Sequence, residues 1–141
     1  MYFTVVTPSY QQGKYIEATI RSILAQKEFI NEYYVFDGGS TDNTVSILEK
    51  YSNSINWISE RDGGQAAAVN KGLRRAKGTY IAWINSDDIL YAGALEIVSK
   101  VFEEHPEVDI VYGKARHIDI NGSTIEHYPT QEWDAKLLDK V

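Results

Sequence analysis

Residues 80–88 decide the fold class of this chain, because an apolar run ends there in two adjacent carboxylates. The stretch reads Tyr80-Ile81-Ala82-Trp83-Ile84-Asn85-Ser86-Asp87-Asp88. An unbroken run of apolar and aromatic residues is typical of a strand that is covered on both faces, in the middle of a parallel sheet. The two carboxylates would then lie at the carboxyl edge of the sheet, where open α/β folds bind ligands.

Asp87 and Asp88 admit two interpretations. Adjacent carboxylates repel each other, and a hard divalent cation relieves the repulsion, since it takes oxygen ligands and is usually shared with phosphates. The same residues also fit a polar loop that caps the following helix, because Ser and Asp are preferred N-cap residues. This stretch alone leaves the two interpretations equally open, and the other strand-end loops have to decide.

Composition bounds the class of protein. The chain has 141 residues, 43% of them hydrophobic and 24% charged, which predicts one globular domain. Its net charge of -6 argues against a nucleic-acid partner, but a small anion held through a metal remains allowed. Without cysteine there is no disulfide, thiolate zinc site or cysteine nucleophile. The amino-terminal residues resemble neither a signal peptide nor a membrane span, so we expect a soluble chain.

Hydrophobic periodicity predicts alternating strands and helices. Strands are expected over residues 3–7, 33–36, 55–58, 79–84 and 108–112, and helices over 14–26, 41–51, 65–76 and 93–104. The first strand should stop at Pro8, which cannot donate to a ladder. The third helix should turn Ala66, Val69 and Leu73 inward. Gly78 should close it as a C-terminal glycine.

Four successive strand-then-helix units predict an α/β fold with a mostly parallel sheet and helices on both faces. Asn121-Gly122, between two short extended segments over residues 115–120 and 123–127, predicts a β-hairpin near the carboxyl terminus. Residues 132–138 carry a weak helical pattern with few apolar positions. We therefore expect a single domain over residues 1–141, with an α/β core over 1–113 and a hairpin and tail over 114–141.

The loops that follow the predicted strands bring polar residues to one rim of the sheet. These residues are Pro8, Ser9, Tyr10, Asp37, Asp62, Asp87 and Asp88. Glycines follow Asp37 and Asp62, and they let the backbone approach a ligand, while amides at the starts of helices can face phosphate oxygens. Both acids also fit simple turns. The rim suits a flat anionic ligand, although neither a G-x-G-x-x-G fingerprint after the first strand nor a P-loop is present.

Four motifs in this order resemble the family 2 glycosyltransferases, which have the GT-A fold. They are Thr7-Pro8-Ser9-Tyr10, Asp37-Gly38-Gly39-Ser40-Thr41-Asp42, Asp62-Gly63-Gly64-Gln65 with Asn70-Lys71-Gly72, and Asn85-Ser86-Asp87-Asp88. The resemblance implies an inverting enzyme of polysaccharide biosynthesis, which moves a sugar from a nucleoside diphosphate sugar to a hydroxyl of a glycan or lipid-linked acceptor. It also implies Mn²⁺ or Mg²⁺ at the diphosphate.

The resemblance implies site residues as well. The nucleotide sugar would be bound by Pro8, Ser9, Tyr10, Asp37, Asp62, Asn70 and Asp87. Asp87 and Asp88 would hold the metal as the D-x-D motif of the family. The chain departs from the family pattern at several places, among them Ala67 and Lys114, where close relatives tend to carry acids. Gly38 stands where many relatives carry a second acid that often contacts the base, and Asn85 stands at the first place of the D-x-D motif.

Other functions remain open at this stage. A nucleotide-sugar-binding module without transfer activity is one alternative, and a sugar-phosphate nucleotidyltransferase is another, although the glycine- and arginine-rich loop of that class is missing after the first strand. The catalytic base is unknown, since the acids after residue 112 lack the sequence setting of the family's base. We therefore expect a piece of a longer enzyme, cytoplasmic and at the inner face of a membrane, with homo-oligomerisation left open.

Overall fold

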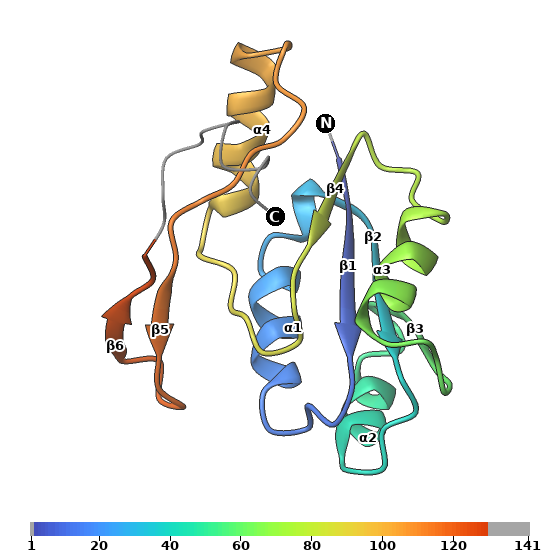
Figure 1. The fold of residues 1–141 in the computed structure, drawn as a ribbon. Helices are drawn as coiled ribbons and strands as arrows, with labels where there is room; N and C mark the ends of the chain where they lie inside the picture. The colour runs from blue at the N-terminus through green and yellow to red at the C-terminus, as the bar shows by residue number, and fades with distance from the viewer. Residues whose placement is uncertain (1, 130–141) are drawn as a thin grey trace, which may run out of the picture. The chain divides into compact units, whose positions relative to one another are not determined.

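The computed structural model describes residues 2–129, and its contacts divide the chain into two compact units, Met1–Glu104 and the residues from His105 onward. The first unit contains strands β1 (Phe3–Ser9), β2 (Ile30–Asp37), β3 (Asn56–Ser59) and β4 (Tyr80–Trp83), the short 3-10 helix η1 (Lys27–Phe29), and helices α1 (Ile16–Leu24), α2 (Thr44–Lys50), α3 (Gln65–Leu73) and α4 (Ala94–Glu104). The four strands pair in parallel in the order β3-β2-β1-β4 (Figure 1). The predicted α/β class is confirmed, whereas the single domain and its boundary at residue 113 stay predictions.

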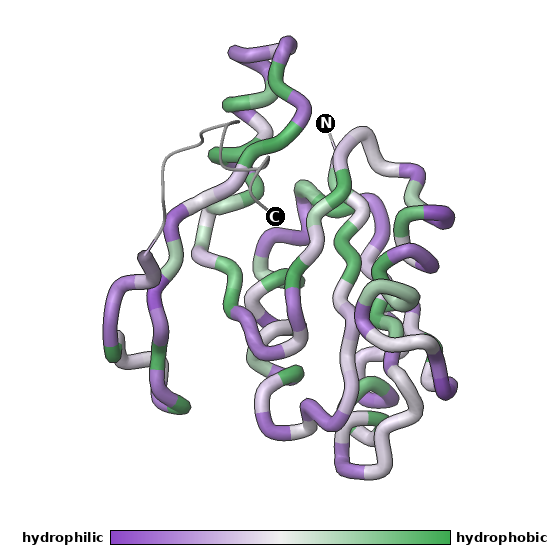
Figure 2. The backbone as a smooth tube through the Cα atoms, viewed as in Figure 1, coloured by the Kyte–Doolittle hydropathy of each residue, from purple (hydrophilic) through white to green (hydrophobic). Residues whose placement is uncertain are grey.

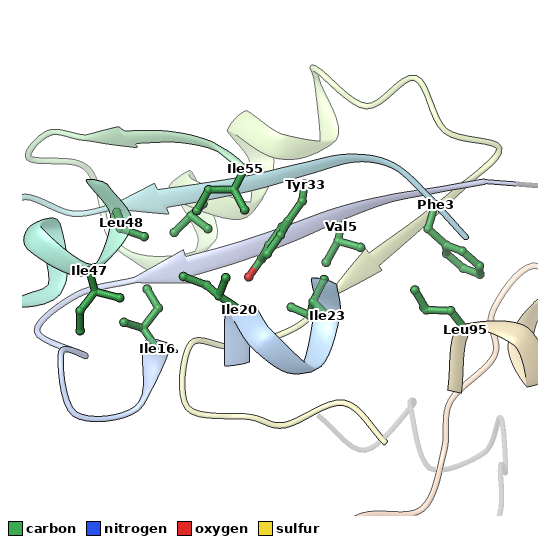
Figure 3. Close-up of a cluster of buried hydrophobic side chains, with 11 residues drawn as sticks. Phe3, Val5, Ile16, Ile20, Ile23, Tyr33, Ile47, Leu48, Ile55 and Leu95 are labelled. Atoms are coloured by element: carbon green, nitrogen blue, oxygen red, sulfur yellow. The ribbon is translucent and has the colours of Figure 1, made fainter. Parts of the chain in front are cut away.

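The main core lies on the sheet face covered by α1 and α2 (Figure 3). Its buried residues are Phe3, Val5, Ile16, Ile20, Ile23, Tyr33, Val35, Ile47, Leu48, Ile55 and Leu95. Ile16, Ile20 and Ile23 belong to the helix predicted over residues 14–26, and they share one of its faces because they lie three and four positions apart. Burial of these side chains provides the main stabilisation of the sheet that carries the strand-end loops.

Helix α3 covers the opposite face, where Val6, Phe36 and Ala68 form a smaller cluster. Figure 2 shows hydrophilic residues along the outer side of this helix. Its buried residues are Ala68, Val69 and Gly72, so of the three predicted inward residues Val69 is confirmed, whereas Ala66 and Leu73 are exposed. The reason lies at Gly72, where an added Cβ would lie 2.4 Å from a methyl carbon of Val6. The glycine lets the helix approach β1 closely and so selects the inward face.

Strand β1 continues through Pro8 to Ser9, although the sequence predicted a stop at the proline. Alternate residues of a parallel strand direct their backbone groups to opposite neighbours. The carbonyl of Ser9 accepts from the residue after β2, and the carbonyl of Val6 accepts from the residue after β4. Pro8 therefore faces the side on which β4 has already ended at Trp83. Its missing N–H leaves no partner unsatisfied.

Strand β4 forms one edge of the sheet within the described residues, whereas the sequence placed it in the middle. Ile81 and Trp83 are 45% and 53% exposed, while Tyr80 and Ala82 pack against the core. An apolar sequence allows both faces of a strand to be buried. Whether both faces are buried depends on the helices and strands that pack against it. On the second face, α3 packs mainly on β1 and β2, and the Ile81 and Trp83 side chains of β4 remain exposed.

Gly78 does not close a helix. Helix α3 ends at Leu73, and the Gly78 amide donates to the Thr4 hydroxyl at 2.9 Å. An added Cβ at this glycine would lie 2.5 Å from the Thr4 backbone nitrogen. Gly78 is therefore needed for the close passage of the chain beside β1 just before β4 begins.

The second unit contains the predicted hairpin, formed by β5 (Arg116–Ile118) and β6 (Thr124–His127), with Gly122 at φ 81° in its turn. The strand predicted over residues 108–112 is absent from the described part of the chain, and Ile110 is 78% exposed. Its β-branched and aromatic residues are typical of a strand, but a strand needs a ladder partner, and no described residue pairs with it. The weak helix predicted over residues 132–138 lies outside the described residues. None of the helices between residues 2 and 129 combines the length and apolarity that a membrane span requires.

Candidate functional site

An open hollow of about 770 Å³ lies at the carboxyl ends of the parallel strands. Its lining comes from the loops after all four strands and from the first turn of α3, as expected where parallel strands end at a common edge. It brings together five of the predicted site residues, which are Pro8, Ser9, Tyr10, Asp62 and Asp87. A hollow of this size accommodates a ligand of several hundred Å³.

Asp37 belongs to the framework of the site rather than to its surface. The side chain is 1% exposed. Its carboxylate accepts hydrogen bonds from the Gly39 and Ser40 amides, from the Ser40 hydroxyl at 2.5 Å and from the Ser59 hydroxyl at 2.6 Å. The sequence placed this acid correctly at the end of β2. Its partners show that it joins the loop after β2 to the end of β3.

Gly38 and Gly39 shape the floor of the hollow. A Cβ at Gly38 would lie 3.4 Å from both the Tyr10 ring and an Asp62 carboxylate oxygen, so the glycine leaves room between them. Gly39 has φ +84°, a conformation that side chains rarely adopt. The Tyr10 ring is 61% exposed and can stack on a flat ligand. A planar group therefore fits beside Tyr10 at this end of the hollow.

The loop before α3 presents backbone amides to the hollow. An Asp62 carboxylate oxygen accepts from the Gly64 amide at 2.7 Å, and Gly64 has φ +94°. The first amides of a helix have no partner within the helix and can donate to phosphate oxygens. Arg61 also lines the hollow here and was not among the predicted site residues. Its only sequence signal was its position next to Asp62.

The Asn70-Lys71-Gly72 motif lies on α3. Lys71 Nζ donates to a Glu60 carboxylate oxygen at 2.8 Å, and this hydrogen bond lowers the pKa of Glu60. The ion pair ties the helix to the segment that leads into the Asp62 loop. Asn70 is exposed on α3 and does not line the hollow within the described residues. Its contact with a ligand stays a prediction.

The loop after β4 carries the acid pair. The carbonyl of buried Ser86 accepts from the Thr19 hydroxyl at 2.9 Å, which anchors the loop to α1. Asp87 lines the hollow, and an Asp88 carboxylate oxygen accepts from the Asn85 side-chain amide at 3.1 Å. The Asn85 side-chain oxygen in turn accepts from Gln65, the first residue of α3, at 2.9 Å. Gln65 belongs to the third motif, but the sequence did not predict its bond to Asn85, which links the two loops.

Asp87 and Asp88 fit a divalent cation that is shared with a ligand. Between residues 2 and 129, no cluster of three or more His, Cys, Asp or Glu side chains could hold a metal by itself. Mg²⁺ is often held by one or two carboxylates together with substrate phosphates and water. The two carboxylates beside the hollow satisfy this requirement, provided that the ligand supplies phosphate oxygens.

A parallel sheet with a hollow at the carboxyl ends of its strands defines an α/β protein that binds a ligand at this edge. Residues 4–139 match the family described as glycosyl transferase family 2. The chain belongs to this family, which confirms the resemblance inferred from the four motifs. E. coli chondroitin synthase is 34% identical to it over 127 residues, which cover 88% of this chain and 18% of the synthase. The first curated relatives are much longer, since the chain spans between 13% and 21% of their lengths.

Solved structures support the same fold. S. aureus TarS 1-349 in complex with UDP-GlcNAc is 32% identical with a TM-score of 0.66, covering 75% of this chain and 32% of that chain. The mannosyltransferase PcManGT from Pyrobaculum calidifontis, in complex with GDP-Man and Mn²⁺, is 25% identical with a TM-score of 0.62. That similarity covers 70% of this chain and 32% of the mannosyltransferase. The predicted GT-A fold is thereby confirmed.

Proposed function

We propose that this chain forms the donor-binding part of an inverting, metal-assisted glycosyltransferase. The enzyme moves a sugar from a nucleoside diphosphate sugar to a hydroxyl of a glycan or a lipid-linked acceptor. One observation carries the proposal: the first turn of α3 and Asp87 line the same hollow, at the carboxyl ends of the strands. A diphosphate in this hollow would meet both the helix amides and a metal held by the carboxylates.

The two ends of the hollow suggest how a donor would lie. Tyr10 and Gly38 offer an aromatic ring and open space for the nucleoside base. Asp37 would contribute without contacting the base, because its buried carboxylate fixes the glycine loop that faces the base. The first amides of α3 and the acid pair would then face the diphosphate. TarS is in complex with a uridine nucleotide sugar and PcManGT with a guanosine nucleotide sugar. In this chain, Gly38 stands where many members of the family carry an acid that often contacts the base.

Asp87 and Asp88 would hold Mn²⁺ or Mg²⁺. When bound, the cation supplies Lewis-acid stabilisation of the negative charge on the departing diphosphate. The α3 amides share this task, since hydrogen bonds to a phosphate oxygen strengthen as charge develops on it. Asp62 keeps the loop before α3 in place through its bond to Gly64. A cytoplasmic location at the inner face of a membrane, the acceptor and any homo-oligomer stay predictions.

Calorimetric titration with UDP, GDP, CDP and ADP, each with and without Mn²⁺, tests the proposal. We expect at least one diphosphate to bind in a manner that depends on Mn²⁺. Asp88→Ala should abolish the metal dependence without changing the far-UV circular dichroism, because the residue is exposed at the rim. Asp109→Ala, which removes an exposed carboxylate from the second unit, serves as the control and should bind as the unchanged chain does. Unaltered affinity in Asp88→Ala would contradict the metal site, and failure of every diphosphate to bind would contradict the donor site.

A further inference from the structure

The Asn85 side chain makes three hydrogen bonds that together fix its orientation. Its Oδ1 accepts from the Trp83 indole N–H at 3.0 Å and from Gln65 Nε2 at 2.9 Å. Its Nδ2 donates to an Asp88 carboxylate oxygen at 3.1 Å. Exchange of the nitrogen and the oxygen would place the NH₂ group against two N–H donors and the oxygen against a carboxylate. Only one orientation of the amide satisfies all three partners.

These bonds connect two segments that are distant in sequence. Gln65 is the first residue of α3 and follows the glycine loop, whereas Asp88 belongs to the loop after β4. Asn85 stands between them and is half-buried. Because Asp88 is exposed, its carboxylate would otherwise rotate freely at the rim. The amide restrains one carboxylate oxygen, and the Gln65 bond makes this restraint depend on the position of the α3 loop.

Asn85 is better suited to orient a carboxylate than to act as a ligand. Its Oδ1 already accepts two hydrogen bonds, which leaves little capacity for a cation. Asp87, in contrast, lines the hollow, and its carboxylate accepts no hydrogen bond from any residue between 2 and 129. An aspartate at position 85 would place a carboxylate oxygen where Asn85 Nδ2 now donates to Asp88, about 3.1 Å from the Asp88 carboxylate. An amide at this position avoids that repulsion.

We propose that Asn85 is a positioning residue that couples the diphosphate-binding loop before α3 to the carboxylate of Asp88. The inference rests on the proposed function, because it assumes that Asp88 holds a cation at the diphosphate. Gln65, which makes no hydrogen bond to Asp87 or Asp88, controls the metal affinity through Asn85. Partners of metal ligands typically change metal affinity by 10- to 100-fold when removed.

The test measures Mn²⁺ affinity by electron paramagnetic resonance of free Mn²⁺, with the 141-residue chain saturated by the diphosphate that binds best. Asn85→Ala and Gln65→Ala should each weaken Mn²⁺ binding about tenfold. The double variant should also lose about tenfold rather than about a hundredfold, because both changes break one connection. Asn53→Ala, an exposed amide between α2 and β3, is the matched control and should keep the affinity of the unchanged chain. Equal melting temperatures would show that the fold is retained.

Two outcomes would overturn the coupling. Wild-type Mn²⁺ affinity in Gln65→Ala would show that the α3 loop does not act through Asn85. Losses that multiply in the double variant would show that the two residues act independently. Either result, together with Mn²⁺-dependent diphosphate binding by the unchanged chain, leaves the proposed function standing. Absence of such binding in the unchanged chain would overturn both.

Discussion

Asp37 and Asp88 carry the same side chain at the same edge of the sheet, in opposite environments. Asp37 is buried and accepts four hydrogen bonds from protein donors, whereas Asp88 is exposed and accepts one from Asn85. The sequence predicted that both acids follow strands of the parallel sheet, but it could not separate a carboxylate that holds loops from one that stays exposed and is proposed to hold a cation. The difference between the two environments depends in part on Ser59, which lies on β3 and donates to the Asp37 carboxylate. No sequence motif relates Ser59 to Asp37, so this contact could not be predicted.

Asp37→Asn should destabilise the chain even without ligand. The amide provides one acceptor oxygen where the carboxylate provides two, and its NH₂ group would face donors in a buried place. We expect the free energy of unfolding to fall by about 1–3 kcal/mol, the usual effect of leaving buried polar groups unsatisfied. Urea denaturation measures the change, with Asp109→Asn as the exposed control. A stability equal to that of the unchanged chain would show that the four hydrogen bonds contribute little.

Helix α3 shows what periodicity can and cannot predict about an element. Its existence and its start at Gln65 agree with the sequence, but its buried face is rotated from the predicted one. A helical wheel ranks side chains by hydrophobicity and gives glycine no weight. The close approach at Gly72 depends on the shape of β1 beneath it, which no local pattern contains. Similarly, the apolar run of β4 could not reveal that the strand lies at an edge.

Gly72→Ala tests the importance of this close approach. In an unobstructed helix, alanine would stabilise by about 1 kcal/mol relative to glycine. Here the new Cβ would lie 2.4 Å from Val6, so we expect a net destabilisation of about 1–3 kcal/mol from overpacking. Gly63→Ala, whose Cβ would meet only Ala67 at 3.4 Å, is the matched control for thermal denaturation. A stabilised Gly72→Ala variant would show that the helix can move away from the strand at little cost.

Asp42, in the turn before α2, makes a pH-dependent contribution to the stability of the folded chain. The pKa of Asp42 is lowered, mainly by a hydrogen bond from the Thr44 hydroxyl and also by hydrogen bonds from the Thr44 and Gly13 amides. Burial raises this pKa, but by less than the Thr44 hydroxyl lowers it. Because the pKa is lower in the folded state, the stabilisation is present above the ordinary carboxyl pKa and disappears as the pH falls through the folded pKa. Asp42→Ala should therefore lower the free energy of unfolding by about 0.5–1 kcal/mol at pH 7, a small value because the side chain is exposed. Well below the folded-state pKa of Asp42, the same substitution should change the free energy of unfolding very little. Urea denaturation across this pH range measures the difference, and a difference independent of pH would contradict the assignment.

At the scale of the whole molecule, the parallel sheet and its loop-lined edge followed from strand and helix periodicity because those signals are local. The strand predicted over residues 108–112 was wrong because its formation requires a pairing partner, and pairing is not encoded in the strand alone. The hairpin was predicted correctly, since Asn121-Gly122 specifies its own turn within a few residues. Local chemistry thus accounts for the successes, and contacts between distant segments account for the failures.

The 141-residue chain should bind a donor without transferring its sugar. Inverting transfer needs a carboxylate base at the acceptor hydroxyl. The carboxylates around the hollow already have other roles, since Asp37 is buried, Asp62 caps Gly64, and Asp87 and Asp88 are assigned to the metal. Incubation with a radiolabelled donor and a panel of hydroxyl acceptors should yield at most slow hydrolysis by water. Rapid transfer would show that one of these acids, or an acid elsewhere in the chain, acts as the base.

The half-exposed Trp83 gives the proposed donor site an intrinsic fluorescence signal. Its indole N–H is bonded to Asn85, so any ligand that shifts the acid-pair loop changes the polarity around the fluorophore. Paramagnetic Mn²⁺ near Asp88 would quench its emission by proximity, whereas diamagnetic Mg²⁺ would not. A chain that carries Trp57→Phe and Trp133→Phe would retain Trp83 as its single tryptophan, which can be excited selectively over tyrosine. Occupancy of the site could then be followed by stopped-flow fluorescence without a labelled nucleotide.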